Sequence, residues 1–235
     1  MVAGTRTRLM ADELQVDVWS DIVCPWCAIG ITQFLKAREQ LKGEVDLTIR
    51  FMPFELNPDM GPEGHNQIDL LAKAYNKTPA DVLEMRRTVE ATGADVGFPM
   101  TWQGEGEEPV LMVWNTHKAH MLLRWVLTVS DTEAQLRLKL AFLRAYFQLR
   151  QNVSDDAVLL DIAEAEGFDR AGAEAALKDE ALSTAITMEE QRARQNNISS
   201  VPTFVVAGKY ILQGAAKPEE YSAALVKLAS MEAMA

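Results

Sequence analysis

Cysteine is scarce in this chain of 235 residues, and its two cysteines, Cys24 and Cys27, are only three positions apart. A disulfide between such close neighbours closes too short a loop to stabilise a fold appreciably. A structural zinc site normally needs four ligands, but the sequence has no second cysteine pair and only three histidines. The scarcity argues against a disulfide scaffold and against a zinc site, and we expect no metal. The two cysteines therefore indicate a chemically reactive pair rather than a structural one.

Long apolar runs and an excess of positive charge are also missing. No apolar run approaches the roughly 20 residues that cross a bilayer. The net charge of -11 argues against nucleic acid and against anionic membranes as partners, because phosphate binding needs clustered Lys and Arg. Arg6 and Arg8 are not followed by the apolar stretch of a secretory signal. We therefore expect a cytosolic protein without a membrane or nucleic-acid partner.

The first fifty residues carry two periods of hydrophobicity. Apolar Leu14, Val16 and Val18 alternate with polar or larger residues, and residues 45–51 alternate in the same way. This period of two predicts strands. Between them, apolar residues recur at spacings of three and four, and Gly43 follows as a typical helix terminator. The pattern predicts a βαβ unit with parallel strands and a right-handed crossover.

A proline- and glycine-rich loop over 54–64 leads into about 130 residues with helical spacing. We expect helices to begin at Thr78-Pro79 and at Ser154, and others to occupy 114–129, 132–149 and parts of 171–196. The pattern then returns to β, with a hairpin over 203–212 and a last helix from Pro218. The predicted order is βαβ, a large helical insertion, then ββα. We place the outer unit at 14–62 and 198–232, and the inserted helical domain at 63–197.

The segment Cys24-Pro25-Trp26-Cys27 has the spacing of a redox pair. The thiolate is the nucleophile in disulfide exchange, and an ordinary cysteine pKa of about 8.5 leaves little of it at neutral pH. A cysteine at a helix N-terminus is helped by free backbone N–H groups and by the helix dipole. We therefore expect Cys24 to be the exposed nucleophile with a lowered pKa. Cys27, one turn later, then attacks the mixed disulfide.

A second feature is Val201-Pro202, directly before a short strand. The bond is either an ordinary trans bond at a strand edge or a cis bond facing the cysteines, and the ββα that follows favours cis. In that position Val201 and Pro202 would contact an extended substrate segment. Pro25 and Trp26 are the other expected substrate contacts, although Trp26 packing onto the insertion is the alternative.

Four polar residues are weaker candidates for a functional role. His117 and His120 are three apart on a predicted helix and could share a metal, but such pairs are more often surface or core residues. Glu55 and Asn57 are interpreted as turn residues.

Several separate motifs resemble the FrnE-like branch of the DsbA superfamily. In order along the chain they are Asp21-Ile22-Val23-Cys24-Pro25-Trp26-Cys27, Phe54-Glu55-Leu56-Asn57-Pro58, Asn115-Thr116 with His120, Arg144-Ala145-Tyr146-Phe147, and Val201-Pro202 with Gly208-Lys209-Tyr210 and Gly214-Ala215. The resemblance implies an α/β thioredoxin fold interrupted by helices, cytosolic residence and disulfide exchange. It carries the redox pair to Cys24 and Cys27 and the cis-proline to Pro202.

Two positions depart from the family pattern. Thioredoxin and DsbA-type proteins often have a buried acid six positions before the first cysteine, where this chain has Val18. Asp21 is nearer but is expected in a loop, so the group that exchanges a proton with Cys27 is open. Ala28 replaces a frequent tyrosine after the second cysteine.

The predicted function is thiol–disulfide exchange through the Cys-Pro-Trp-Cys pair, with protein or small-molecule disulfides as substrates, no cofactor, and glutathione as a candidate redox partner. The alternative is a glutathione-dependent isomerase or transferase of the 2-hydroxychromene-2-carboxylate isomerase or kappa class, which resembles this layout but has serine at the position of Cys24. A binding module that has lost turnover is a third hypothesis. An insulin-reduction assay separates the three. No oligomeric state is predicted.

Overall fold

A computed structural model describes residues 12–234. Its main sheet contains β1 (Asp12–Ser20), β2 (Val45–Pro53), β5 (Thr203–Val206) and β6 (Tyr210–Gln213), in the order β2-β1-β5-β6. β1 and β2 are parallel and are joined by α1 (Pro25–Gln40), whereas β5 pairs antiparallel with both β1 and β6. This confirms the predicted α/β thioredoxin fold, with βαβ at the start and ββα at the end of the chain.

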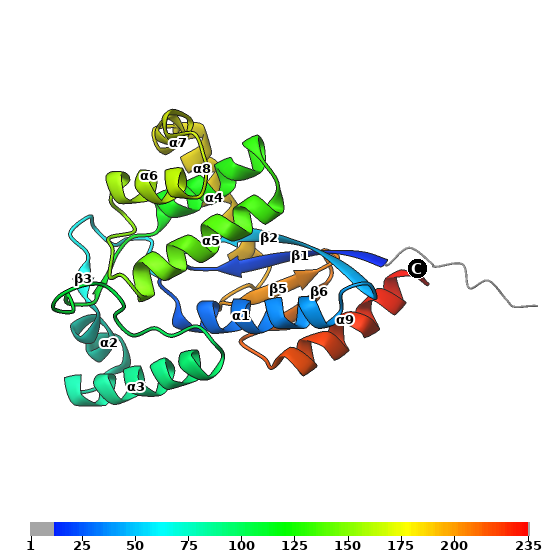
Figure 1. Cartoon of the computed structure of the whole chain (residues 1–235), viewed down its shortest axis with the longest axis horizontal. Helices are drawn as coiled ribbons and strands as arrows, with labels where there is room; N and C mark the ends of the chain where they lie inside the picture. The colour runs from blue at the N-terminus through cyan, green and yellow to red at the C-terminus, as the bar shows by residue number, and fades with distance from the viewer. Residues whose placement is uncertain (1–11, 235) are drawn as a thin grey trace, which may run out of the picture.

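Helix α1 and the last helix, α9 (Pro218–Glu232), cover one face of the sheet (Figure 1). Three aromatic rings join these layers. Phe34 of α1 stacks on Phe204 of β5 with ring centroids 4.6 Å apart, and Tyr221 of α9 meets both rings edge-on at 5.2 and 5.1 Å. Such pairs stabilise a core beyond the area that they bury. They hold α1, and with it the cysteine pair, against the sheet.

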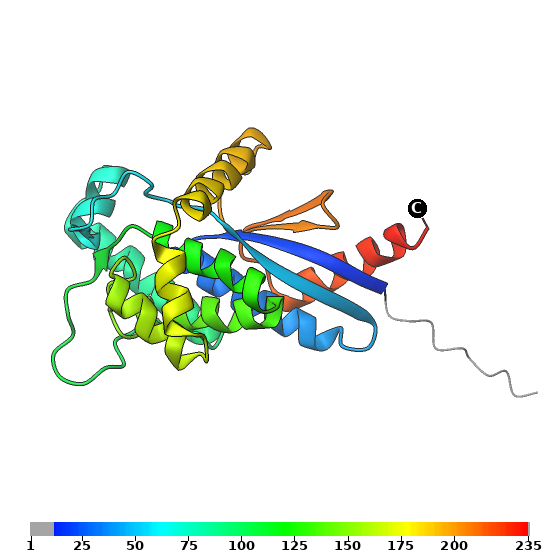
Figure 2. The ribbon, with the colours of Figure 1, turned by 90° about the horizontal axis from the view of Figure 1, so that it is seen from above.

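The chain between β2 and β5 is mostly helical, and part of it lies against the opposite face of the sheet (Figures 1 and 2). Its helices are α2 (Gln67–Tyr75), α3 (Pro79–Asp95), α4 (His117–Val129), α5 (Thr132–Phe147), α6 (Asp156–Ala165), α7 (Arg170–Leu177) and α8 (Glu180–Gln195). A large cluster of buried apolar side chains runs from the sheet into these helices, and a smaller one joins Trp19, Phe54, Ala193 and Ile198. The division into an outer unit and an inserted domain remains a prediction. No helix within residues 12–234 is both long enough and apolar enough to cross a membrane.

Some element boundaries differ from the predictions. A short antiparallel ribbon of β3 (His65–Asn66) and β4 (Met112–Val113) was not expected, because two-residue strands are too short to show a period. The helix expected from 114 begins at His117, since the side chain of Asn115 accepts the His117 N–H at 2.9 Å. The helix expected from Ser154 begins at Asp156, because Asp155 is its N-cap.

Helix α5 closes the free edge of β2 at one point. The side chain of Gln135 is fully buried, accepts the N–H of Phe51 at 2.7 Å and donates to the Phe51 carbonyl at 3.0 Å. It also donates to the carbonyl of Leu123 in α4 at 3.0 Å. The amide therefore pairs with the β2 backbone as a neighbouring strand would. The same helix carries Lys139 toward the end of β1.

Candidate functional site

Cys24 is the N-cap residue of α1, as predicted. Its backbone is extended (φ -88°, ψ 114°), Pro25 follows in the first turn, and the Cys24 carbonyl accepts the N–H groups of Cys27 and Ala28 at 3.1 and 3.3 Å. The proline fits there because a helix leaves its first N–H groups without intrahelical partners. The sulfur of Cys24 thus sits at the positive end of the helix dipole.

Cys27 lies one turn further into the helix, and both cysteines are free thiols. The exposed fraction is 4% for Cys24 and 0% for Cys27. The expectation that Cys24 is exposed is therefore wrong. Cys24 is nevertheless the more exposed of the two cysteines. Burial raises the pKa of the Cys27 thiol well above its usual value, and the adjacent Cys24 side chain acts in the same direction. The charge of Lys139 and the backbone of Asp21 oppose this shift.

The Val201–Pro202 bond is cis, which confirms the prediction. The Cys24 sulfur lies 3.9 Å from the Val201 carbonyl oxygen. Pro202 also packs so closely on α1 that a Cβ placed on Gly30 would lie 2.8 Å from its Cγ atom. Residues almost at opposite ends of the chain therefore meet at the redox pair. Trp26 beside them is 46% exposed, so it is not packed away onto the helical segment. That these residues bind substrate remains a prediction.

Charged groups lie buried behind the cysteines. Asp21, in the loop after β1, is fully buried and accepts the backbone N–H groups of Ile22 at 2.6 Å and Leu56 at 2.8 Å. His120 of α4 is 2% exposed, with its Nε2 atom 3.7 Å from Asp21 Oδ1. Burial opposes ionisation of Asp21, but the contact with His120, the Leu56 N–H and the Thr116 side chain together lower its pKa. Burial lowers the pKa of His120.

Lys139 completes this buried group, which we call the Asp21–His120–Lys139 cluster. Its side chain reaches from α5 to the end of β1, where Nζ donates to the Ser20 carbonyl at 3.3 Å and lies 5.8 Å from the centre of the Phe51 ring. Burial lowers the pKa of Lys139 to about 8, while the charges of Cys27, Asp21 and Cys24 act in the opposite direction. A fully buried lysine is rare and expensive in free energy.

The spacing of apolar residues on α5 indicates that Lys139 is buried, although the sequence analysis did not single out this residue. Leu136, Leu140 and Leu143 form an apolar stripe on α5, and Lys139 lies three residues after the first of them and four before the last. These spacings put it on the buried face of the helix. A cation on an apolar face indicates either a buried partner or a long side chain reaching solvent. Only the tertiary structure distinguishes the two.

A second network surrounds Glu55, which was expected to be a turn residue. Glu55 is only 4% exposed; its carboxylate contacts His117 Nδ1 at 2.7 Å and accepts the Asn115 amide at 3.0 Å. The other ring nitrogen of His117 lies 2.8 Å from the hydroxyl of Ser183 in α8. His117 and His120 thus contact different carboxylates, Glu55 and Asp21. No cluster suited to a metal ion occurs within the described range 12–234.

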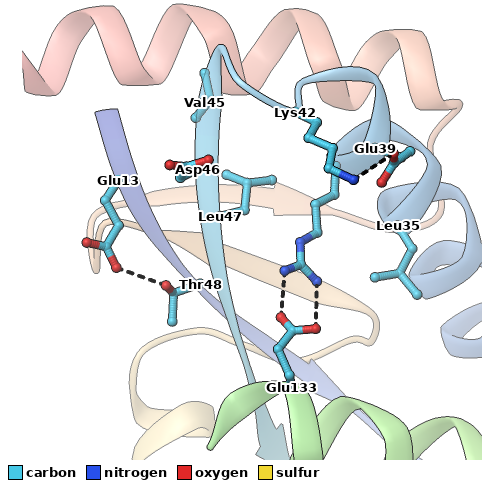
Figure 3. A pocket seen from close by; sticks show the side chains of 10 residues that line it. Glu13, Leu35, Glu39, Lys42, Val45, Asp46, Leu47, Thr48 and Glu133 are labelled. Atoms are coloured by element: carbon cyan, nitrogen blue, oxygen red, sulfur yellow. Dashed lines mark hydrogen bonds and ion pairs between the residues drawn. The ribbon is translucent and has the colours of Figure 1, made fainter. Parts of the chain in front are cut away.

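A surface groove of about 790 Å³ lies elsewhere. Figure 3 shows that Glu13, Leu47 and Thr48 of the β1–β2 edge face it, with Lys42 and Glu133 across from them. Its walls carry both signs of charge, and an Arg38–Glu133 ion pair crosses it. Neither cysteine lines this groove, so its size alone does not connect it with the redox pair.

Comparison with known proteins agrees with this geometry. Residues 15–226 match the family described as the DSBA-like thioredoxin domain. The chain belongs to this family. Membership confirms the DsbA superfamily resemblance and fits its FrnE-like branch.

One curated protein and several solved structures are similar to this chain over nearly their full lengths. An uncharacterised protein of Bacillus subtilis, YwbO, is 26% identical over 213 residues, which cover 90% of this chain and 96% of that protein. The crystal structure of a probable DsbA oxidoreductase from Streptomyces coelicolor has a TM-score of 0.80 and 25% identity, covering 91% of this chain and 89% of that chain. The cytosolic disulfide reductase DsbM of Pseudomonas aeruginosa, also solved with glutathione, has a TM-score of 0.61 and 15% identity, covering 92% and 99%.

Proposed function

We propose that this DSBA-like protein is a thiol–disulfide oxidoreductase that works through Cys24 and Cys27. The observation that carries the proposal is the pair of free thiols at the first turn of α1, with the Cys24 sulfur 3.9 Å from the Val201 carbonyl. Family membership and the resemblance to a probable DsbA oxidoreductase support it. In this proposal Pro25, Trp26 and the Val201-Pro202 backbone form the surface that receives the substrate.

The reaction has two exchange steps. The Cys24 thiolate attacks one sulfur of a substrate disulfide, the substrate S–S bond breaks, and one substrate thiolate leaves. The thiol of Cys27 then loses its proton and attacks the Cys24 sulfur, which releases the second substrate thiolate and leaves a Cys24–Cys27 disulfide. The substrate gains two electrons and the protein loses them. Run in reverse, the same steps oxidise a dithiol.

The division of labour is tested with Cys24→Ser and Cys27→Ser. Cys24→Ser removes the first nucleophile, so we expect no disulfide reduction and no covalent adducts. Cys27→Ser keeps the first step but cannot resolve it, so mixed disulfides accumulate and disappear on adding dithiothreitol. Non-reducing gels of the two variants show the difference, with the double variant as the control. Adducts on Cys24→Ser and none on Cys27→Ser would reverse the assignment.

We propose glutathione as the redox partner that restores the cysteine pair after each turnover. The likeness to a reductase solved with glutathione motivates this choice. If Cys27→Ser retains full turnover with glutathione, the protein uses a one-thiol glutathione mechanism, and the glutathione-dependent alternative takes precedence. The cytosolic location remains a proposal, which cell fractionation tests.

A further inference from the structure

During disulfide exchange, the Cys27 thiol must transfer its proton to another group. Cys27 is fully buried and its pKa is raised by burial, so it cannot supply a thiolate unaided at neutral pH. The acid that related proteins often bury beneath this position is absent, because Val18 stands there and is 1% exposed. Some other group must therefore take the proton.

Three buried ionisable groups lie near the end of β1, and they narrow the choice of proton acceptor. The contact with His120 and the Leu56 N–H lower the pKa of Asp21, which makes it a weaker base. Burial lowers the pKa of His120, and the positive charge of Lys139 lowers it further; its Nε2 atom has no hydrogen-bond partner among the described residues. Lys139 Nζ has one acceptor, the Ser20 carbonyl at 3.3 Å, although an ammonium can donate three hydrogen bonds. Lys139 therefore has donor capacity to spare for a neighbouring sulfur.

We propose that Lys139 is the proton acceptor and donor for the thiol of Cys27, an inference that rests on the proposed disulfide exchange. In the resolving step the neutral amine of Lys139 takes the proton of Cys27, the Cys27 thiolate attacks the Cys24 sulfur, and the mixed disulfide breaks. The resulting ammonium releases its proton to solvent. In the reverse direction the ammonium protonates Cys27 as its bond to Cys24 breaks. No further oxidant or reductant is needed.

The electrostatic surroundings match this role. Lys139 Nζ contacts the Ser20 carbonyl at the end of β1. The charges of Cys27, Asp21 and Cys24 raise the pKa of Lys139, and its own charge lowers that of His120. The thiol and the amine act on each other, since Lys139 lowers the pKa of Cys27 while Cys27 raises that of Lys139. Burial penalises the charged form of each group, whereas a thiolate–ammonium pair relieves part of both penalties. Proton transfer between them therefore creates two charges that stabilise each other.

The test separates the two exchange steps. The reduced protein is mixed rapidly with an aromatic disulfide that releases a coloured thiol. The first release reports attack by Cys24, and the second reports resolution by Cys27. In the unchanged protein we expect two phases, with the second rising with pH to a midpoint near the Lys139 pKa of about 8. Absence of two phases in the unchanged protein would contradict the proposed function itself rather than the role of Lys139.

Lys139→Met removes the amine at nearly the same volume. We expect the second phase to slow by about a hundredfold at neutral pH, as is typical for loss of a general base, and its midpoint near pH 8 to vanish, while the first phase changes little. Lys139→Arg keeps the charge but releases no proton in this range, so it should not restore the rate. Lys36→Met, at an exposed position on α1, is the control. An unchanged second phase in folded Lys139→Met, or full rescue by arginine, overturns the proposal.

A measurement on the unchanged protein covers the case in which these variants do not fold. Lysine labelled with ¹⁵N reports the titration of Lys139 by NMR in the reduced and disulfide forms. The charges of Cys27 and Cys24 both raise the pKa of Lys139, so the disulfide, which removes both charges, must lower that pKa. Identical titrations in the two redox forms would overturn the proposal.

Discussion

Gly30 shows how one missing side chain brings the two halves of the redox site together. It lies on the buried face of α1, directly against the ring of Pro202. A Cβ there would be 2.8 Å from the Pro202 Cγ atom and 3.5 Å from Ala215. Glycine normally weakens a helix interior relative to alanine, so its presence is explained by this close approach rather than by helix propensity.

Gly30→Ala is therefore expected to destabilise the protein despite the better helix former. Forcing a methyl into a packed contact typically costs about 1–3 kcal/mol, more than the propensity gain. Urea unfolding measures this loss, and the redox reaction should slow as Pro202 shifts away from Cys24. Lys36→Ala, exposed on the same helix, provides the control and should change the free energy of unfolding little. An increase in stability for Gly30→Ala would show that Pro202 moves aside freely.

At the scale of elements, α5 has two functions in the fold. It closes the β2 edge through Gln135 and carries Lys139 to the end of β1. An exposed strand edge is prone to pair with other chains, and here a buried amide occupies part of it. The position of Lys139 therefore depends on the same helix that stabilises the sheet.

Gln135→Leu keeps the volume but leaves the N–H and carbonyl of Phe51 without these partners. Each buried unpaired backbone group costs about 1–3 kcal/mol, so for the two groups we expect a loss of about 2–6 kcal/mol in the free energy of unfolding. Chemical denaturation measures the loss. Arg137→Ala, at an exposed position two residues further along α5, is the matched control. Equal stability of Gln135→Leu and the unchanged protein would mean that the β2 edge is not held by this amide.

At the scale of the whole molecule, buried carboxyl groups connect the loop after β2 with α4 and α8. Glu190 of α8 is 3% exposed, and its carboxyl oxygen accepts the N–H of Glu55 at 2.7 Å. Burial and the nearby charge of Glu55 raise the pKa of Glu190 to about 7. The Glu190 carboxyl is thus protonated in the folded protein at a pH where the unfolded chain has already ionised it.

This linkage predicts the pH dependence of Glu190→Gln. A folded pKa above the usual 4.5 means that Glu190 costs no stability at low pH and an increasing amount as pH rises from about 5 to 7. Glutamine keeps the acceptor for the Glu55 N–H but never ionises. The stability of the variant relative to the unchanged protein should therefore increase across this window, by on the order of 1–2 kcal/mol.

The stability of Glu190→Gln must be compared with that of the unchanged protein at each pH, because neighbouring groups also make stability depend on pH. His117 has a raised pKa through its contact with Glu55, and its contribution is lost as pH rises. His120 has a lowered pKa and acts in the opposite sense. Denaturation at several pH values, with the exposed α8 residue Glu180 changed to Gln as the control, isolates the contribution of Glu190. A pH-independent difference would contradict the burial of its charge.

The strands, helices and cysteine spacing near the start of the chain could be predicted from the sequence alone. Alternation over 14–19 and 45–51, the helix between them and the Cys24–Cys27 spacing each depend on neighbours within a few residues, where pattern and propensity are informative. The N-cap position of Cys24 follows from the strand before it and the proline after it. The ribbon of β3 and β4 could not be predicted, because strands of two residues are too short to show a period of hydrophobicity.

The tertiary structure alone decided which distant groups meet. Val201 reaches Cys24 from 177 residues along the chain, and Lys139, Glu55 and His117 acquired their partners only when α4, α5 and α8 packed together. Burial shifts a pKa only after solvent is removed from every side, and no local pattern encodes that closure. The redox pair could therefore be predicted from four consecutive residues, whereas the buried amine proposed to serve it depends on the packing of the whole fold.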